Sequence, residues 1–218
     1  MSNPFLKTAL CAAAFALAAV LPQAHAATIV VQPEDVTISD GRASRQAPVE
    51  SVIDGTGFTQ AEKDLLDTGD PVPSPYPNHS NTTGDNWRVV DDDSILMTFD
   101  LGDTFLLDGF HVWNFNESGQ TGRGAKSVDV SFSTDGTNFS SAANFTFVEA
   151  TGATTYTGED YSLNATTSAR WVRFDIQNSH NDPDRVGLSE VRFLAIPEPA
   201  SVALIGLGGI MLLARRRW

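Results

Sequence analysis

Side chains able to hold a polar ligand occur in segments of the chain without strand periodicity. Planar polar groups can bond pairs of sugar hydroxyls, and an aromatic ring can cover the C–H face of a sugar. Trp87 with His79, Asn116 and Arg123 supplies that combination. Because such segments are expected to be loops, the pattern predicts a carbohydrate site at a loop-bearing end of the domain. The candidate ligand-binding residues are His79, Trp87, Asn116, Glu117, Arg123, Asn178 and His180.

Each of these residues also has an interpretation that involves no ligand. Asn116 and Glu117 can stabilise their own loop, and Arg123 can pair with Glu117. The sequence leaves both interpretations open. Exposure of Trp87 beside polar groups would favour a sugar site over a purely structural role.

Catalytic motifs are absent from the sequence. It contains neither a Gly-x-Ser-x-Gly elbow nor a His-Glu-x-x-His motif, and its 4 histidines are scattered. Its many carboxylates do not define a glycosidase pair, because such a pair needs a cleft and a set separation. The glycine-rich run 119–124 is not followed by a helix, as a nucleotide loop would be. The sequence therefore predicts a protein that is not an enzyme, and a hydrolase with an unrecognised site is the least favoured alternative.

The charge balance excludes some classes of partner. The 218 residues include 14 Lys and Arg against 27 Asp and Glu, which gives a formal net charge of −13. A nucleic-acid groove needs a basic footprint, so no nucleic-acid partner is expected. The single cysteine, Cys11, rules out a disulfide framework and a cysteine-based zinc cluster.

Residues 1–26 have the pattern of a secretory signal peptide. Lys7 supplies an early positive charge, and an alanine-rich apolar run over 8–21 predicts a short helix. Ala-His-Ala at 24–26 places small residues where a signal peptidase reads them, so cleavage is expected after Ala26. The exported chain then contains no cysteine, which suits an extracellular protein stabilised by its core.

The C-terminal segment has the order of a sorting signal. Pro197, Glu198 and Pro199 precede an apolar stretch over 200–214, and three arginines follow it. The stretch predicts a transmembrane helix, although it is shorter than the usual ~20 residues, and the arginines hold its end in the cytoplasm. An ordinary tail anchor is one interpretation. The order also resembles the PEP-CTERM signal, which implies transient insertion in the inner membrane, processing by an exosortase and a cell-surface or matrix location in a Gram-negative bacterium.

The body over 27–195, between the signal peptide and the sorting signal at 196–218, is predicted to be one all-β domain. Apolar and polar residues alternate over 128–132 and 172–176, which is the period of a half-buried strand. Many short strands separated by turns indicate an antiparallel β-sandwich. Further β-rich runs, bounded by glycine and aspartate turns, cover 95–99, 110–113, 145–148 and 191–193.

Two segments depart from the strand pattern. A turn or two of helix is predicted within 59–66, where Thr59 can cap the first turn. Prolines alternate with other residues over 71–77, so this run cannot be a central strand. The range 68–86 is therefore predicted to be a long, surface-exposed insertion loop.

Seven short motifs follow one another in the order of a known family. They are Val52–Gly55, Phe99–Gly102, Val112–Glu117, Arg123–Val128, Ser133–Phe139, Ala169–Phe174 and Gly187–Phe193. In this order they resemble the discoidin domain, also called the coagulation factor 5/8 type C domain, over nearly all of the body. The resemblance implies an eight-stranded antiparallel jelly-roll β-sandwich of the galactose-binding-like type. Members are mostly non-catalytic binding modules, many for carbohydrate and some for phospholipid or protein.

The resemblance also implies a structural calcium ion near the start and end of the sandwich. Carboxylate and backbone oxygens are the hard ligands that calcium takes. Asp54 and Glu190 match positions that supply side chains in the family, and Thr59 is the third candidate ligand, although no Trp follows it as the family often has. Without calcium, Asp54 would stabilise its own turn and Glu190 would pair with Arg173 or Arg192.

These observations predict an exported, surface-sorted binding protein. Its expected ligand is extracellular carbohydrate or exopolysaccharide, held by loops at the rim of the sandwich. The alternative is a structural matrix or adhesion protein that binds another protein and has no sugar site.

Overall fold

The predicted body of the chain is the part that the structure covers. The segments predicted as signal peptide (1–26) and tail helix (200–214) lie outside it, so both stay predictions. Within the described part, no helix is both long and apolar enough to cross a membrane. The structure, a computed structural model, describes residues 27–39, 42, 44–140 and 143–197.

Strands dominate the described residues, which contain nine strands and three short helical segments. The strands are β1 (Ile29–Val31), β2 (Asp35–Ile38), β3 (Arg45–Gln46), β4 (Trp87–Val90), β5 (Ile95–Asn114), β6 (Ala125–Ser133), β7 (Ala143–Thr146), β8 (Glu159–Ser179) and β9 (Arg185–Ala195). The helical segments are η1 (Val49–Val52), α1 (Gln60–Lys63) and η2 (Thr121–Arg123). The short helix predicted after Thr59 is therefore present as α1, with Thr59 at its N-cap.

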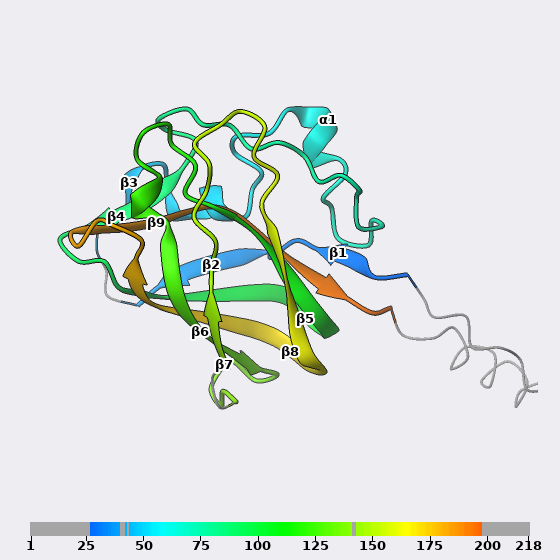
Figure 1. Ribbon diagram of the computed structural model, residues 1–218. Helices are drawn as coiled ribbons and strands as arrows, with labels where there is room; N and C mark the ends of the chain where they lie inside the picture. Colours follow the sequence, from blue (N-terminus) through cyan, green and yellow to red (C-terminus); the bar gives the residue numbers. More distant parts are fainter. Residues whose placement is uncertain (1–26, 40–41, 43, 141–142, 198–218) are drawn as a thin grey trace, which may run out of the picture.

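Two long strands join the layers of the sandwich, because each runs through both (Figure 1). The first half of β5 pairs with β2 and with the second half of β8, beyond which lie β6 and β7. The second half of β5 pairs with β9 and with the first half of β8. Strand β9 carries β1 and β4 on its other edge, and β3 lies outside β4. All these pairings are antiparallel, which confirms the predicted all-β antiparallel sandwich.

One of the glycine and aspartate turns predicted to bound the strands, the one that follows 95–99 at residues 101–103, does not end a strand, so that detail of the prediction is wrong. β5 continues through it, and its register with β8 shifts between Asp100 and Phe105. Gly102 has a φ of 80°, a left-handed conformation that residues with a Cβ disfavour. A glycine that permits a turn also permits a bulge, and here the bulge lets β5 bend from one layer into the other.

Aromatic side chains fill the space between the layers. Phe99 and Phe174 come from the first layer, whereas Phe110 and Phe193 come from the second, and all four are fully buried. Ring centroids lie 5.5 Å apart for Phe99 and Phe193 and 5.2 Å apart for Phe110 and Phe174. The rings meet edge-to-face or tilted, the arrangements that aromatic quadrupoles favour. The bent strands thus bury their apolar faces against each other.

The segment 68–86 forms none of the named helices or strands, as predicted, but it is exposed only in part. It covers a second apolar cluster, against which Tyr76 packs. The indole Nε1 of Trp113 donates a hydrogen bond to the Pro77 carbonyl at 3.0 Å. The loop is therefore fixed to the sandwich by its own buried contacts. The cluster comprises Phe58, Leu66, Trp113, Ala150 and Tyr156.

Substituting Phe110 by alanine tests the interlayer core. Because the ring is fully buried among other rings, we expect Phe110→Ala to lower the free energy of unfolding by about 3–5 kcal/mol. Leu106→Ala on the same strand is the control, since Leu106 is 38% exposed and should cost far less. Urea unfolding monitored by fluorescence measures both changes. Equal losses for the two variants would contradict this assignment of the core.

Acid titration tests the ion pair that links β5 to β8. Arg170 donates to Asp100 from Nε at 2.8 Å and from Nη2 at 3.0 Å, and these bonds lower the pKa of Asp100 below its ordinary 3.8. A lowered pKa contributes stability above the unfolded-state pKa, and that stability is lost as the pH falls through the folded-state pKa. We therefore expect Asp100→Asn to lower the melting temperature at pH 7, with the gap to the native protein closing below pH 3.8. Asp67→Asn, at an exposed position, is the control; a gap independent of pH would contradict the pairing.

Candidate ligand-binding site

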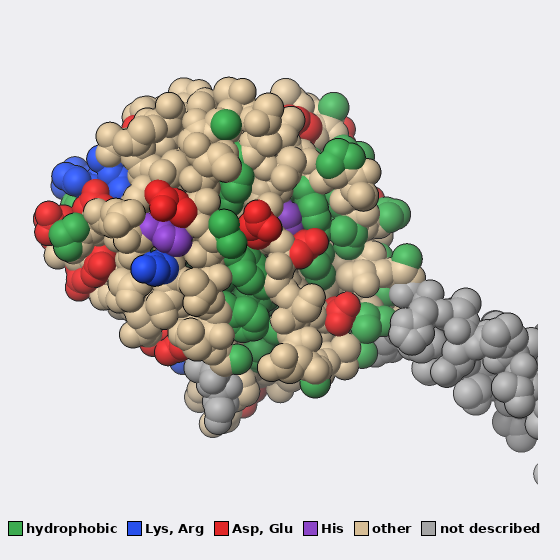
Figure 2. Space-filling view, viewed as in Figure 1, with side chains coloured by type: hydrophobic (Ala, Val, Ile, Leu, Met, Phe, Trp, Pro, Cys, Tyr) green, Lys and Arg blue, Asp and Glu red, His purple; other side chains and the backbone are tan. Residues whose placement is uncertain are grey.

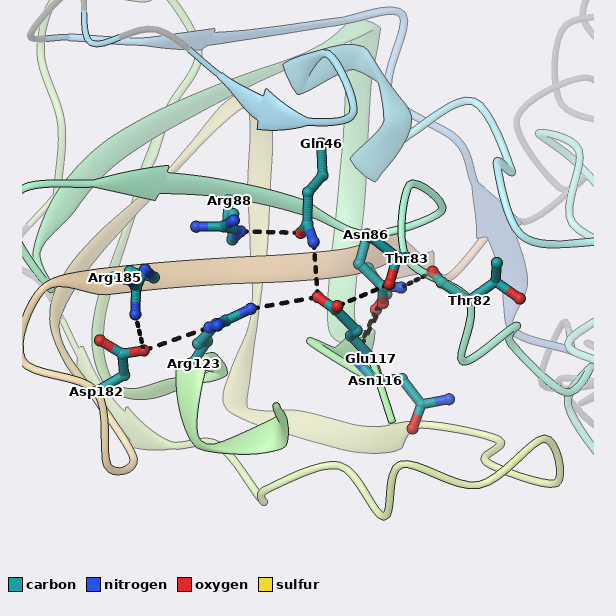
Figure 3. A network of polar contacts seen from close by, with 11 residues as sticks. Gln46, Thr82, Thr83, Asn86, Arg88, Asn116, Glu117, Arg123, Asp182 and Arg185 are labelled. Carbon is teal, nitrogen blue, oxygen red and sulfur yellow. Dashed lines mark hydrogen bonds and ion pairs between the residues drawn. The ribbon is translucent and has the colours of Figure 1, made fainter. Parts of the chain in front are cut away.

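Polar side chains from separate segments of the chain meet at one end of the sandwich (Figure 3). Figure 1 places this end, marked by β3 and β4, away from the side where β1 and β9 lead to the ends of the described chain. We call this group the end network. Its members are Gln46, Thr83, Arg88, Glu117, Arg123, Asp182 and Arg185.

Glu117 is the hub of the end network. Its Oε2 accepts hydrogen bonds from Gln46 Nε2 at 2.7 Å and from Arg123 Nη1 at 3.3 Å, and its Oε1 accepts one from the Thr83 hydroxyl at 2.8 Å. Both charged side chains are mostly buried, with 11% of Glu117 and 13% of Arg123 exposed. The pairing of Arg123 with Glu117 considered from the sequence is thus present.

Asp182 extends the network toward solvent. Its Oδ2 accepts from Arg123 Nε at 3.3 Å and from Arg185 Nη1 at 3.0 Å. Arg123 therefore bridges two carboxylates, one from the loop after β5 and one from the loop before β9. The Arg185 side chain is 39% exposed, so its guanidinium reaches the surface.

Arg88 stands in the network without a carboxylate partner. Its Nε donates to Gln46 Oε1 at 2.9 Å, and the described residues offer it no ion pair. Burial lowers the pKa of Arg88, and the nearby charges of Arg123 and Arg185 lower it further, against the opposing effects of Glu117 and Asp182. Gln46, which bridges Arg88 and Glu117, has a φ of 70°, which is uncommon for a residue other than glycine. A strained residue at the centre of a polar network is the kind of feature that occurs at functional sites.

Asn116 lies fully buried behind the end network and ties several loops together. Its amide nitrogen donates to the carbonyls of His79 at 3.1 Å and Ala153 at 3.0 Å, and its side-chain oxygen accepts from the Gly152 amide at 2.9 Å. Its backbone amide donates to Asn86 Oδ1 at 3.0 Å. Because these polar atoms are all engaged inside the protein, Asn116 positions the loops and is not accessible to a ligand.

Trp87 and His79 are also buried, which corrects the sequence prediction that they contact a ligand. Trp87 points into the core from β4, and its Nε1 donates to the Ser44 hydroxyl at 2.8 Å. The two ring nitrogens of His79 face the carbonyls of Ser80 at 2.8 Å and Thr56 at 2.9 Å, and burial lowers the pKa of this histidine. Neither ring presents a face to solvent, so the expected stacking of a sugar on Trp87 does not fit this structure.

Asn178 and His180 lie where β8 ends, beside the start of β6 rather than in the end network. The backbone amide of His180 donates to the Gly124 carbonyl at 3.0 Å. Asn178 Oδ1 and His180 Nε2 are buried atoms without a hydrogen-bond partner among the described residues, and burial lowers the pKa of His180. Of the seven predicted ligand residues, the structure brings only Glu117 and Arg123 together at the end network.

The residues predicted to bind calcium make other contacts. Glu190 Oε2 accepts from the Gly55 amide at 2.9 Å, and its Oε1 contacts Arg192 Nη1. Asp54 Oδ1 accepts from the Thr56 amide at 2.7 Å, the turn-stabilising role open to it from the sequence. The Thr59 hydroxyl donates to Glu62 at 2.8 Å. No group of three His, Cys, Asp or Glu side chains able to hold a metal occurs in the described part of the chain.

The chain's own cations lie where this calcium ion was expected. Lys63 Nζ donates to the Asp54 carbonyl at 3.2 Å, and the buried Arg192 guanidinium pairs with Glu190 and reaches the Leu66 carbonyl at 3.1 Å. Burial raises the pKa of Glu190 to about 7, against the opposing effect of Arg192. The predicted ligands therefore do not fit a calcium ion, because Glu190 is bound to Arg192 and Thr59 to Glu62, while Asp54 holds its own turn.

Comparison with known proteins agrees with the fold. The model of the F5/8 type C domain family matches residues 43–191. The chain belongs to this family. Residues 195–217 match the PEP-CTERM protein-sorting motif, which confirms the resemblance seen in the tail. A comparison with curated proteins found no match.

Solved structures include domains similar to this F5/8 type C protein. One is CBM32-3 from a family 31 glycoside hydrolase of Clostridium perfringens, with a TM-score of 0.52 and 14% identity over 76% of this chain and 94% of that one. Another is the family 32 CBM from C. perfringens NanJ in complex with galactose, with a TM-score of 0.49 and 12% identity over 77% of this chain and 98% of that one. At 14% identity, the first likeness shows the shared fold alone.

Sequence reasoning missed most of the end network, although one signal was available. Trp87 and Val89 alternate with Arg88 and Val90, a period-two pattern that places Trp87 and Arg88 on opposite faces of a strand. Reading 87–90 as a strand would have assigned Trp87 to the core and Arg88 to the outer face. No comparable signal marks the other members, since the contacts between their segments arise only in the folded chain.

Thermal melting in calcium and in chelator tests the calcium prediction. Because Arg192 and Lys63 contact the predicted ligands, we expect the same melting temperature in both buffers. Arg192→Met should instead lower the melting temperature, since it leaves the buried Glu190 without its cation. A rise in the melting temperature of the native protein with calcium would show that the ion binds.

Proposed function

We propose that this protein is an exported, surface-sorted, non-catalytic module that binds extracellular carbohydrate or exopolysaccharide at the end network. The observation that carries the proposal is the end network itself. Guanidinium, carboxylate and amide groups are held together there by mutual bonds, with Arg185 and Gln46 reaching solvent. Such planar groups bind sugar hydroxyls in pairs.

The comparisons support the proposal at the level of the fold. The chain belongs to the F5/8 type C family, and the NanJ module similar to it is described in complex with galactose. The PEP-CTERM motif supports export through the inner membrane, processing by an exosortase and display at the cell surface or in the matrix of a Gram-negative bacterium. The described chain ends away from the end network, so a sorted tail would leave the network free (Figure 1).

One observation favours the alternative of a matrix or adhesion protein that binds another protein. With Trp87 buried, the end network lacks the aromatic face on which sugars commonly stack. Carbohydrate binding would then depend on hydrogen bonds alone. A direct measurement of glycan binding is therefore needed to distinguish the two functions.

A glycan array probed with the full chain, purified in mild detergent, provides that measurement. We expect specific binding to at least one glycan, weakened about tenfold by Arg185→Gln, because this removes hydrogen bonds from a charged donor. Arg173→Gln is the matched control, since Arg173 lies over the Phe139 ring, outside the end network. A protein that melts normally yet binds no glycan would refute the proposal and favour the adhesion alternative.

A further inference from the structure

Strand β7 lies at the edge of its layer and carries no charge. Among the described strands it pairs with β6 alone, so its other edge presents backbone amides and carbonyls that no strand pairs. Natural proteins usually protect such an edge with charged side chains, a proline or a covering segment, because an open edge pairs readily with another strand. The sequence over 143–148, which contains β7, has neither a charged residue nor a proline. Strand β7 therefore lacks these protections.

The other edges of the described sheet have a charge or a cover. The loop after α1 covers β1, because the Val30 amide donates to the Asp70 carbonyl at 2.8 Å and the Val30 carbonyl accepts from the Gly69 amide at 2.9 Å. Strands β2, β3 and β8 each begin with a charged residue, respectively Asp35, Arg45 and Glu159. The contrast identifies β7 as the edge to which a further strand can add.

Partly exposed apolar side chains lie beside the open edge. Figure 2 shows a strip of hydrophobic side chains on the face where Figure 1 places β7 and the first part of β8. Phe145 and Tyr161 are only partly buried, with ring centroids 6.2 Å apart, and Val148 is 51% exposed. The Val148 amide donates to the Tyr161 hydroxyl at 2.8 Å, which joins this segment to β8. Contiguous apolar surface of this kind marks protein–protein interfaces.

We propose that β7 pairs antiparallel with β7 of a second copy of this chain. Identical strands that meet across a two-fold axis present the same backbone groups to each other, so the contact is self-complementary and closes at two copies. Charge favours a second copy as the occupant of this edge. Chains of net charge −13 repel each other where their acidic surfaces meet, whereas the segment over 143–148 adds no charge to the contact. The pairing brings Phe145 and Val148 of one copy against the same side chains of the other.

The pairing is expected to be weak in solution and stronger at a surface. A strand of 4 residues buries less than the roughly 1,000 Å² of a stable interface, so the association depends on concentration. The surface display proposed above would hold copies at a high local concentration. Figure 1 places β7 apart from β3 and β4, so the end network of each copy stays accessible. The inference goes beyond carbohydrate binding and does not depend on it.

Sedimentation velocity at several protein concentrations tests the pairing. The full chain is kept in a mild detergent whose density matches the buffer, so that bound detergent does not alter the measured mass. We expect a monomer–dimer equilibrium whose dissociation constant rises about tenfold in Ala143→Glu, because like charges then meet across the paired edges. Ala61→Glu is the matched control, since Ala61 is also exposed but lies on α1, away from β7 (Figure 1). It should leave the equilibrium unchanged.

Hydrogen exchange provides a readout that needs no substitution. Amides over 143–146 should exchange more slowly at high than at low protein concentration, because the second strand pairs with part of them. A chain that stays monomeric at every concentration overturns the proposal. A dimer that leaves the exchange of β7 unchanged, or that is undiminished in folded Ala143→Glu, also overturns it, since the contact then lies elsewhere. None of these results bears on the glycan array, so the proposed function is judged separately.

Discussion

The passage of β5 and β8 through both layers is the constraint on which the rest of the structure depends. Each strand pairs with different neighbours in its two halves, so neither layer can form without the other. The bulge at Gly102 provides the bend, and Phe99 and Phe110 on the two sides of it pack into one core. Burial of these rings stabilises the bend, since separating the layers would expose both apolar faces. Long-range pairing of this kind also fixes which loops meet at each end.

Buried polar contacts then position the loops that the core leaves at the ends. Asn116 and Asn86 hold the loop over 79–86 and the loop at 152–153 against β5, and the hydroxyl of Ser189 joins them to β9. Such a network is stable only when its members are satisfied, because an unpaired polar group is costly in a low-dielectric interior. The result is a rigid support behind Glu117, whose side chain gathers the end network. Rigidity of this kind reduces the entropy lost on binding a ligand.

Arginines have different roles at the predicted calcium site and at the end network. Arg192 is fully enclosed and neutralises Glu190, an arrangement that fixes the Gly55 turn to β9. Arg88 is half-exposed and has no carboxylate of its own. The first cation pairs with a carboxylate within the fold, whereas the second bonds only the neutral amide of Gln46. The same residue type therefore neutralises a buried carboxylate in one region and joins a partly exposed polar network in the other.

Local patterns in the sequence determined the fold class, the helix after Thr59 and the sorting tail, because period-two alternation, capping and motif order depend on near neighbours in the chain. They also indicated the Glu117–Arg123 pair, whose members are only six residues apart. They could not determine that Arg88 lies opposite Arg45, or that Arg185 joins Arg123 through Asp182. Those positions depend on pairings between β3, β4 and β9 across long stretches of chain. Only the tertiary structure brings such segments together, since contacts between residues far apart in sequence leave no periodic trace in either one.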